Sequence, residues 1–177
     1  MGKILKIILA IVLFPIAIFY YILKFVYNLI SKKITKKYIS GLTKEKIDGL
    51  DGEEFEDLLA IYFKGIGLGV TKTKKSHDYG ADLIIKHKKE SIAIQCKLYY
   101  KHSVGNSAVQ EISAAREFYG ASRAMVITNS KFTRPSEILA GSIGVELIDG
   151  NKLMKMLSID NKKELLQFLS FWQYIHT

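Results

Sequence analysis

The sequence predicts an α/β fold with a mixed central sheet flanked by helices, preceded by one N-terminal transmembrane helix. Three observations predict this fold class. Residues 7–23 carry no charged side chain and are almost all strongly apolar, which is typical of a membrane span. Residues 82–97 contain two apolar strand patterns joined by a basic turn. In the second half, strand patterns alternate with helical patterns, which favours an α/β core.

The N-terminal apolar run continues over residues 25–30, after Lys24, whose stem can reach toward the membrane interface. At about 1.5 Å per residue, a helix over residues 7–30 is long enough to cross a bilayer with some tilt. Pro15 would kink this helix rather than exclude it. A cleaved signal peptide is the alternative, but no small-x-small cleavage site follows promptly. We therefore expect an uncleaved transmembrane helix over residues 4–30.

The excess positive charge lies beside this apolar run. The net charge is +9, of which residues 1–30 contribute +3, residues 31–50 contribute +4 and residues 51–177 only +2. More lysines follow the span than precede it, so the positive-inside bias predicts a single-pass protein of the cell membrane with its C-terminal bulk in the cytoplasm. Residues 31–50 form a basic juxtamembrane linker, which either rests on anionic headgroups or only keeps the segment soluble.

The folded part begins at Asp51, a helix N-cap that forms a capping-box pattern with Glu54. The helix that follows has an apolar face, which consists of Phe55, Leu58, Leu59, Tyr62 and Phe63. Glu56 lies at the flank of this face, where it can reach inward toward the strands. Three glycines then break the helix, and residues 70–73 can supply a first strand.

Two neighbouring strands in the middle of the chain carry polar groups of three kinds. Period two places Asp82 and Leu83 on opposite faces of the first strand, and Gln95 and Lys97 on one face of the second. The pair 88–89 is compatible with a tight hairpin. An antiparallel pair would gather a carboxylate, an amide oxygen and an ammonium, a grouping suited to metal-assisted phosphodiester hydrolysis. The alternative is an ordinary hairpin with polar residues on its solvent face.

The later elements alternate between helix and strand. They are a helix over 107–119 ended by Gly120, a buried strand over 123–128, a helix over 133–142 with Pro135 in its first turn, a strand over 145–148 and two helical segments reaching Thr177. Proline is tolerated in the first turn of a helix, and glycine commonly ends one. Strands joined by helices in this way imply the mixed sheet.

Several other kinds of site are excluded or disfavoured. The single cysteine, Cys96, excludes an internal disulfide and a zinc cluster built on thiolates. No glycine-rich phosphate-binding pattern is present, so we expect no nucleotide cofactor. His77 and His102 lack a ligand spacing and are interpreted as loop residues. Basic side chains that can track a phosphate backbone are Lys72, Lys74, Lys75, Lys86, Lys101, Arg123, Lys131 and Arg134.

Five segments follow the order and spacing of a known nuclease family. They are residues 52–56, 78–82, 95–97, 126–133 and 144–150. On these motifs, residues 51–157 resemble the Mrr-type restriction endonuclease-like branch of the PD-(D/E)xK nuclease superfamily, in which Gln replaces the usual Glu. The resemblance implies a restriction-endonuclease-like fold, followed here by a C-terminal helical extension over residues 158–177.

The resemblance implies that Asp82, Gln95, Lys97 and Glu56 form the catalytic site. The expected ligands of a Mg²⁺ ion, for which Mn²⁺ can substitute, are Asp82, Glu56, the side-chain carbonyl of Gln95 and the backbone carbonyl of Cys96. Lys97 would position the attacking water or stabilise the transition state. Because Gln95 is neutral where Glu is usual, we expect modest metal affinity.

The resulting prediction is a membrane-anchored, Mg²⁺-dependent DNA endonuclease that hydrolyses phosphodiester bonds. The alternative is a catalytically weak nucleic-acid-binding module tethered to the membrane. Two features depart from the family: a membrane helix occupies the place of the separate DNA-reading domain that many members carry, and Tyr79 replaces a small residue in the turn that Asp78 and Gly80 are expected to order. Nucleases of this kind that cut both strands often pair two sites, so a homodimer is compatible with the resemblance.

Overall fold

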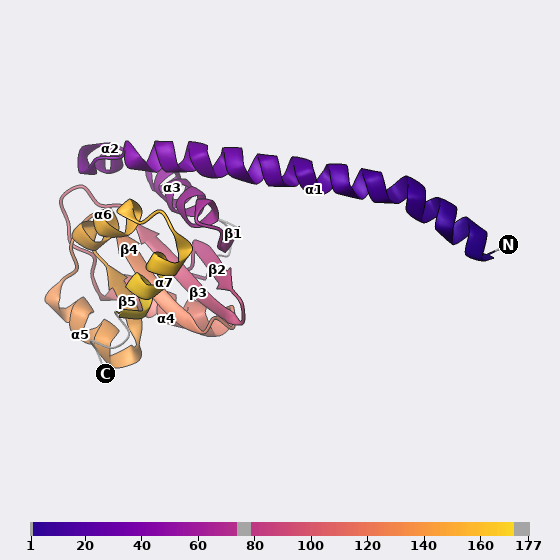
Figure 1. Cartoon of the computed structure of the whole chain (residues 1–177). Coiled ribbons are helices and arrows are strands. Elements are labelled where there is room, and N and C mark those ends of the chain that lie inside the picture. Colours follow the sequence, from indigo (N-terminus) through magenta and orange to yellow (C-terminus); the bar gives the residue numbers. More distant parts are fainter. Residues whose placement is uncertain (1, 74–78, 172–177) are drawn as a thin grey trace.

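The computed structural model describes residues 2–73 and 79–171, and a long helix projects from a rounded body (Figure 1). His77 and Asp78 lie outside the described residues. The helices are Gly2–Ser40 (α1), Lys44–Asp48 (α2), Gly52–Gly65 (α3), Asn106–Phe118 (α4), Arg134–Ile143 (α5), Gly150–Ser158 (α6) and Lys162–Phe171 (α7). The strands are Gly69–Lys72 (β1), Leu83–His87 (β2), Glu90–Lys97 (β3), Arg123–Thr128 (β4) and Val145–Ile148 (β5).

The strands form one mixed sheet, as predicted, in the order β1-β2-β3-β4-β5. The β1–β2 and β2–β3 pairs are antiparallel, whereas β3–β4 and β4–β5 are parallel. The predicted hairpin joins β2 to β3, with His87 opposite Glu90. Lys88 adopts a positive φ of 54° at this turn, a conformation that asparagine or glycine would adopt more easily.

Local sequence signals explain the main helix boundaries. The predicted capping box is present, because the Asp51 side chain accepts from the backbone N–H of Glu54 and the Glu54 side chain accepts from that of Asp51. Thr133 caps α5 through its side chain, which accepts from the backbone N–H of Ser136, and proline lies in the first turn. The α5 helix ends at Gly144, which is left-handed with φ 70°, as glycine allows.

Apolar residues cover both faces of the sheet. On one face, Leu83 and Ile94 belong to a core completed by α3, α6 and α7. On the other, Ile84 and Ala93 belong to a second core completed by α4 and α5. The alternative of an ordinary hairpin with one solvent face is therefore wrong, because α4 covers the face that carries Gln95.

The α1 helix combines an exposed apolar stretch with a segment that packs on the body. Leu13–Ser40 is long and apolar enough to cross a membrane, by length and composition, and none of its apolar window is buried. The helix continues through residues 31–40, within the segment expected to be a linker. Ile39 joins the first core at 8% exposure, and Lys36 forms an ion pair with Asp160. The body therefore holds the end of α1.

The first core also extends beyond residues 51–157. Ile47 of α2 enters it from the N-terminal side, and Leu165 and Leu169 of α7 enter from the C-terminal side, each no more than 1% exposed. The Tyr62 hydroxyl donates to the carbonyl oxygen of Met156, which ties α3 to α6. The elements before and after the nuclease-like segment therefore pack into one body with it.

Candidate active site

The β2–β3 pairing places Asp82 beside the end of β3. Leu83 lies opposite Ile94 in the register, so Asp82 lies next to Gln95. The Asp82 carboxylate accepts a hydrogen bond from the backbone N–H of Cys96, with 2.6 Å between Oδ2 and nitrogen. The Asp82 backbone N–H donates to the carbonyl oxygen of Ile94 at 2.8 Å. Asp82 is thus held at the start of β2 by both its side chain and its backbone.

Gln95 is the buried polar residue of the predicted site, at 4% exposure. Its amide nitrogen donates to Oε2 of Glu111 at 2.6 Å. Because only the nitrogen of an amide can donate to a carboxylate, this bond fixes which end of the amide is the oxygen. The Gln95 Oε1 atom is buried and has no hydrogen-bond partner among the described residues. A buried carbonyl oxygen of this kind can accept from a ligand or coordinate a cation.

Lys97 ends β3 on the same face as Gln95. Its ammonium lies 3.4 Å from Oε2 of Glu111, and the two side chains are 29% and 47% exposed. The same carboxylate oxygen therefore contacts both Gln95 and Lys97. Since this pair is open to solvent, its net contribution to stability is small, and its main effect is to place the ammonium.

Sequence reasoning did not single out Glu111, which lies on α4. The spacing offered a signal: Glu111 lies three residues after Ala108 and four before Ala115, both of which are buried against the sheet. Helical spacing of three and four places a residue beside that buried face. A glutamate flanking an apolar stripe is common, however, and its partners become known only from the packing of α4 on β3.

Gly80 allows α4 to approach the turn before β2. It has a positive φ of 91°, and a Cβ atom built on it would lie 3.0 Å from both the Cβ and the carbonyl oxygen of Glu111. Glycine is therefore needed both for the backbone conformation and for the close contact. The prediction that Gly80 serves this turn is consistent with this geometry, whereas Asp78 lies outside the described residues.

Glu56 lies on α3 and forms an ion pair with Lys72 of β1, with 3.4 Å between Oε2 and Nζ. Lys72 also binds Asp57, at 2.7 Å. Partial burial lowers the pKa of Lys72, but the hydrogen bond and the charges of Asp57 and Glu56 outweigh it, so the pKa is raised. Glu56 thus has a basic neighbour. Lys72, which was predicted to contact phosphate, forms ion pairs with Glu56 and Asp57 instead.

Cys96 shows that the predicted residues share one neighbourhood. Burial raises the pKa of its thiol well above the usual range, and the charges of Asp82 and Glu56 raise it further. The charges of Lys72 and Lys97 act in the opposite direction. Four charged side chains, from α3, β1, β3 and the segment just before β2, therefore act on one sulfur atom. The thiol stays neutral at physiological pH, so it is a packing residue rather than a nucleophile.

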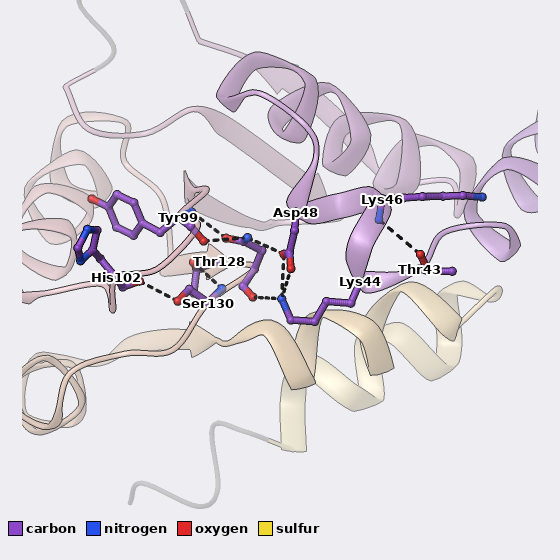
Figure 2. A network of polar contacts seen from close by, with 9 residues as sticks. Thr43, Lys44, Lys46, Asp48, Tyr99, His102, Thr128 and Ser130 are labelled. Carbon is purple, nitrogen blue, oxygen red and sulfur yellow. Dashed lines mark hydrogen bonds and ion pairs between the residues drawn. The ribbon is translucent and has the colours of Figure 1, made fainter.

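A second polar network holds the chain just beyond the site (Figure 2). Asn129, 3% exposed at the end of β4, accepts from the backbone N–H of Tyr99 at 2.8 Å and donates to its carbonyl oxygen at 3.0 Å. The Asn129 amide also donates to Asp48 at 2.8 Å. Lys44 donates to Asp48 at 2.8 Å and to the Asn129 carbonyl oxygen at 3.2 Å. This network connects α2 to the segment that follows Lys97.

The same network changes the ionisation of Asp48. Desolvation raises the pKa of its carboxyl group, but the hydrogen bonds from Lys44 and Asn129 outweigh desolvation and lower it. Asn129 directly follows the carboxyl end of a parallel strand, and open α/β sheets bind ligands at such ends. This position in the sequence is the signal that could have indicated Asn129 as a site residue. His102, interpreted as a loop residue, accepts from the Ser130 hydroxyl through its backbone carbonyl.

The donors at the site are mostly neutral oxygens. Within residues 2–73 and 79–171, no group of three or more histidine, cysteine, aspartate or glutamate side chains is placed to hold a metal ion. A divalent cation would therefore depend on Asp82, Glu56, the unpartnered Gln95 oxygen and backbone carbonyls, the donor chemistry that magnesium accepts. The oxygen donors of these residues fit the chemistry of the expected ion.

One basic residue was wrongly assigned to phosphate contacts. Arg123 forms a two-pronged ion pair with Glu146, at 2.6 and 2.7 Å, and donates to the carbonyl oxygen of Leu169 at 3.0 Å. Both side chains are nearly buried, at 14% and 13% exposure. Arg123 therefore joins β4 to β5 and α7. Lys86, Lys101, Lys131 and Arg134 are exposed.

The chain is similar to known proteins in sequence and in fold. A family model described as "Restriction endonuclease", for the Mrr catalytic domain, matches residues 47–157, more than half of the chain. None of the curated proteins matches the sequence.

The chain is similar to several solved structures, including the following three. AspBHI, a DNA modification-dependent restriction endonuclease, has a TM-score of 0.52 at 13% identity, covering 82% of this chain and 40% of its own. The protein of unknown function AF1548 has a TM-score of 0.48 at 18% identity, with coverages of 63% and 62%. The MspJI restriction endonuclease in complex with a 27-mer oligonucleotide has a TM-score of 0.44 at 17% identity, with coverages of 83% and 35%. This chain spans less than two thirds of each, and the likeness to AspBHI concerns the fold alone.

Proposed function

The chain belongs to the Mrr-type restriction endonuclease family, and from this premise we propose that it is a membrane-anchored, metal-dependent DNA endonuclease. One observation carries the proposal. The β2–β3 pairing sets the carboxylate of Asp82 against the backbone of Cys96, between Gln95 and Lys97. This placement supports a site in which a carboxylate, an amide oxygen and an ammonium act together at the end of one strand pair, a grouping suited to phosphodiester hydrolysis.

Four catalytic side chains, Asp82, Gln95, Lys97 and Glu56, are proposed to carry the reaction, together with the backbone carbonyl of Cys96. Asp82, Glu56 and the carbonyl oxygens of Gln95 and Cys96 would hold a Mg²⁺ ion, for which Mn²⁺ can substitute. A bound divalent cation neutralises phosphoryl charge and lowers the pKa of a coordinated water. Lys97 donates to the phosphoryl oxygens or to the attacking water as negative charge develops. The neutral Gln95 adds no charge that would repel the phosphate.

Glu111 completes the proposal as a positioning residue. Its carboxylate accepts from both the Gln95 amide and the Lys97 ammonium. It therefore orients the amide so that the Gln95 oxygen stays free, and it keeps the ammonium near the end of β3. It contributes this orientation without contacting substrate. Because Lys97 shares only a long, half-exposed contact with Glu111, the ammonium can turn toward a phosphate at little cost.

The membrane part of the proposal rests on α1. Its apolar stretch is unburied, and lysines follow it more densely than they precede it. We place the transmembrane helix at residues 4–30, the juxtamembrane segment at 31–50, the nuclease domain at 51–157 and the C-terminal extension at 158–177. The flanking charges favour a cytoplasmic body, which would keep the enzyme in contact with DNA near the membrane.

A catalytically weak DNA-binding module is the second candidate. It is favoured by the pairing of Glu56 with Lys72 and by the lack, among the described residues, of an acidic cluster able to hold a metal. In this case the body would bind DNA without hydrolysing it. The two candidates differ in a single observable, metal-dependent cutting.

The test uses the full-length chain purified in detergent. Supercoiled, linear and branched DNA are each incubated with Mg²⁺, with Mn²⁺ and with a chelator, and nicked or shortened products are separated by electrophoresis. We expect products only in the presence of a cation. Binding to the same DNA without cutting in any cation would support the module instead, and a chain that neither binds nor cuts DNA would contradict both.

A further inference from the structure

Two aromatic rings lie exposed on the surface near the candidate site. Tyr79 and Phe118 are stacked, with ring centroids 3.9 Å apart and an interplanar angle of 27°. They remain 54% and 58% exposed. Phe118 also contacts Tyr119 edge to face, at 5.0 Å and 88°, and Tyr119 is partly buried against the second core. The pair is therefore held from one side and open on the other.

The backbone at Tyr79 is uncommon for a large residue. Tyr79 has a positive φ of 48° and is followed by Gly80, also at positive φ. Bulky residues seldom adopt this conformation, which costs stability, and such positions occur most often at functional sites. The turn therefore presents an aromatic ring at a position that asparagine or glycine would occupy with less strain.

The aromatic pair is attached to the two elements that carry the site. Tyr79 lies three residues before Asp82. Phe118 lies seven residues after Glu111 on α4, which places both on the same face of the helix, about 10 Å apart. About 10 Å corresponds to roughly three nucleotides of a stacked strand. A strand whose phosphate lies at Lys97 would therefore bring a base close to the rings.

We propose that the Tyr79–Phe118 pair binds an unpaired nucleobase about three nucleotides from the cleaved phosphodiester, so that the preferred substrate is DNA with unpaired bases. This inference rests on the proposed nuclease function and specifies its substrate class. Aromatic side chains stack on the faces of bases, and a paired duplex offers only base edges in its grooves. Faces are available in single strands, flaps and junctions.

The exposure of the rings distinguishes this role from simple packing. A contact that served only to fix the turn to α4 would be satisfied by burying the rings, yet more than half of each stays in contact with solvent. Stacking is tolerant of sequence because every base has a π-face. The pair thus selects unpaired structure rather than a particular base.

The test measures binding by the full-length chain in detergent, without metal so that the strand stays intact. The probe is a 20-nucleotide strand carrying 2-aminopurine, alone or paired in a duplex. Two variants remove one ring each: Tyr79→Asn, because asparagine tolerates positive φ, and Phe118→Ala. Each is expected to weaken single-strand binding roughly tenfold, to abolish quenching of the stacked base, and to leave duplex binding within about twofold.

Two further variants serve as controls. Tyr79→Phe keeps the ring and should bind like the parent, and Tyr38→Ala removes an exposed ring of α1 and should change nothing. The inference would be overturned if the parent bound single strand and duplex with equal affinity. It would also be overturned if both ring-removal variants bound the single strand like the parent. Either result would leave the nuclease proposal intact. If those variants instead change self-association alone, the pair is a protein contact. Failure of every DNA to bind would contradict the proposed function itself.

Discussion

At the scale of single residues, one oxygen of Glu111 accepts from both the buried amide of Gln95 and the ammonium of Lys97. The two contacts differ in kind. Gln95 is almost fully buried, so losing its acceptor leaves a polar group without a partner, which is costly. Lys97 remains accessible to water, so losing its acceptor mainly changes where the ammonium lies. Glu111 thus affects both the stability of the site, through Gln95, and the position of its ammonium group, through Lys97.

Replacing Glu111 separates these two effects. Glu111→Ala should lower the free energy of unfolding by about 1–3 kcal/mol, because the Gln95 amide loses its acceptor. It should also lower the cutting rate roughly 10- to 100-fold, as removing a positioning partner typically does. Glu111→Gln keeps an acceptor and should unfold close to the parent while cutting more slowly. Thermal unfolding and plasmid nicking measure the two quantities, and parental behaviour of both variants would exclude this role.

The sequence predicted which residues of the hairpin share a face, and it did so for a physical reason. Period two assigns Gln95 and Lys97 to one face of β3, and the pairing of Leu83 with Ile94 places Asp82 beside Gln95. The sequence did not identify Glu111 or Asn129, for which it carried only weak signals, or the pairing of Glu56 with Lys72. Those contacts depend on how helices pack against the sheet, which no local pattern specifies.

At the scale of elements, the site depends on the approach of α4 to the turn before β2. The backbones of Gly80 and Glu111 lie close together there. The Glu111 side chain also contacts Gln95 and Lys97 of β3. The strands β4 and β5 have the predicted bounds, because continuous apolar runs between turn residues define them well. The helical course of residues 31–40 was not predicted, since a lysine-rich segment gives no sign that Ile39 will be buried.

A pair of glycine substitutions tests this approach. Gly80→Ala should destabilise the protein by about 1–3 kcal/mol, because alanine is strained at φ 91° and its Cβ would press on Glu111. Gly141→Ala, inside α5 with open space around it, should instead stabilise the protein by up to about 1 kcal/mol. Equilibrium unfolding of both variants is the measurement. Equal stability of Gly80→Ala and the parent would show that α4 does not lie this close.

At the scale of the whole molecule, an apolar helix and a nearly neutral body are joined through a basic segment. Residues 51–177 carry only +2 of the net charge of +9, so general attraction of DNA to the body is weak. The proposed DNA binding would therefore depend on local features of the site and on the aromatic pair. The helix α1 projects from the body (Figure 1), and its end is fixed by Ile39 and Lys36.

The membrane proposal makes a prediction that is independent of catalysis. The full-length chain should resist carbonate extraction from membranes, and a cytoplasm-dependent reporter fused after Thr177 should be active. Ile16→Lys with Ile22→Lys should release it, because each charge at the centre of a span costs about 2.5–3.5 kcal/mol. Ile34→Lys, beyond the apolar run and equally exposed, is the matched control and should stay membrane-bound. A soluble parent chain starting beyond residue 23 would show a cleaved signal instead.

The central claim is that the β2–β3 hairpin hydrolyses DNA, and a metal titration of two variants tests it most directly. Lys97→Ala should reduce the nicking rate by about 10²–10³ without rescue by added Mg²⁺ or Mn²⁺, since a free cation does not replace a positioned ammonium. Asp82→Asn keeps an acceptor for the Cys96 N–H but weakens metal binding, so raised cation should restore part of its activity. Both should unfold near the parent temperature. If both fold and nick DNA at the parental rate, the hairpin is not the active site.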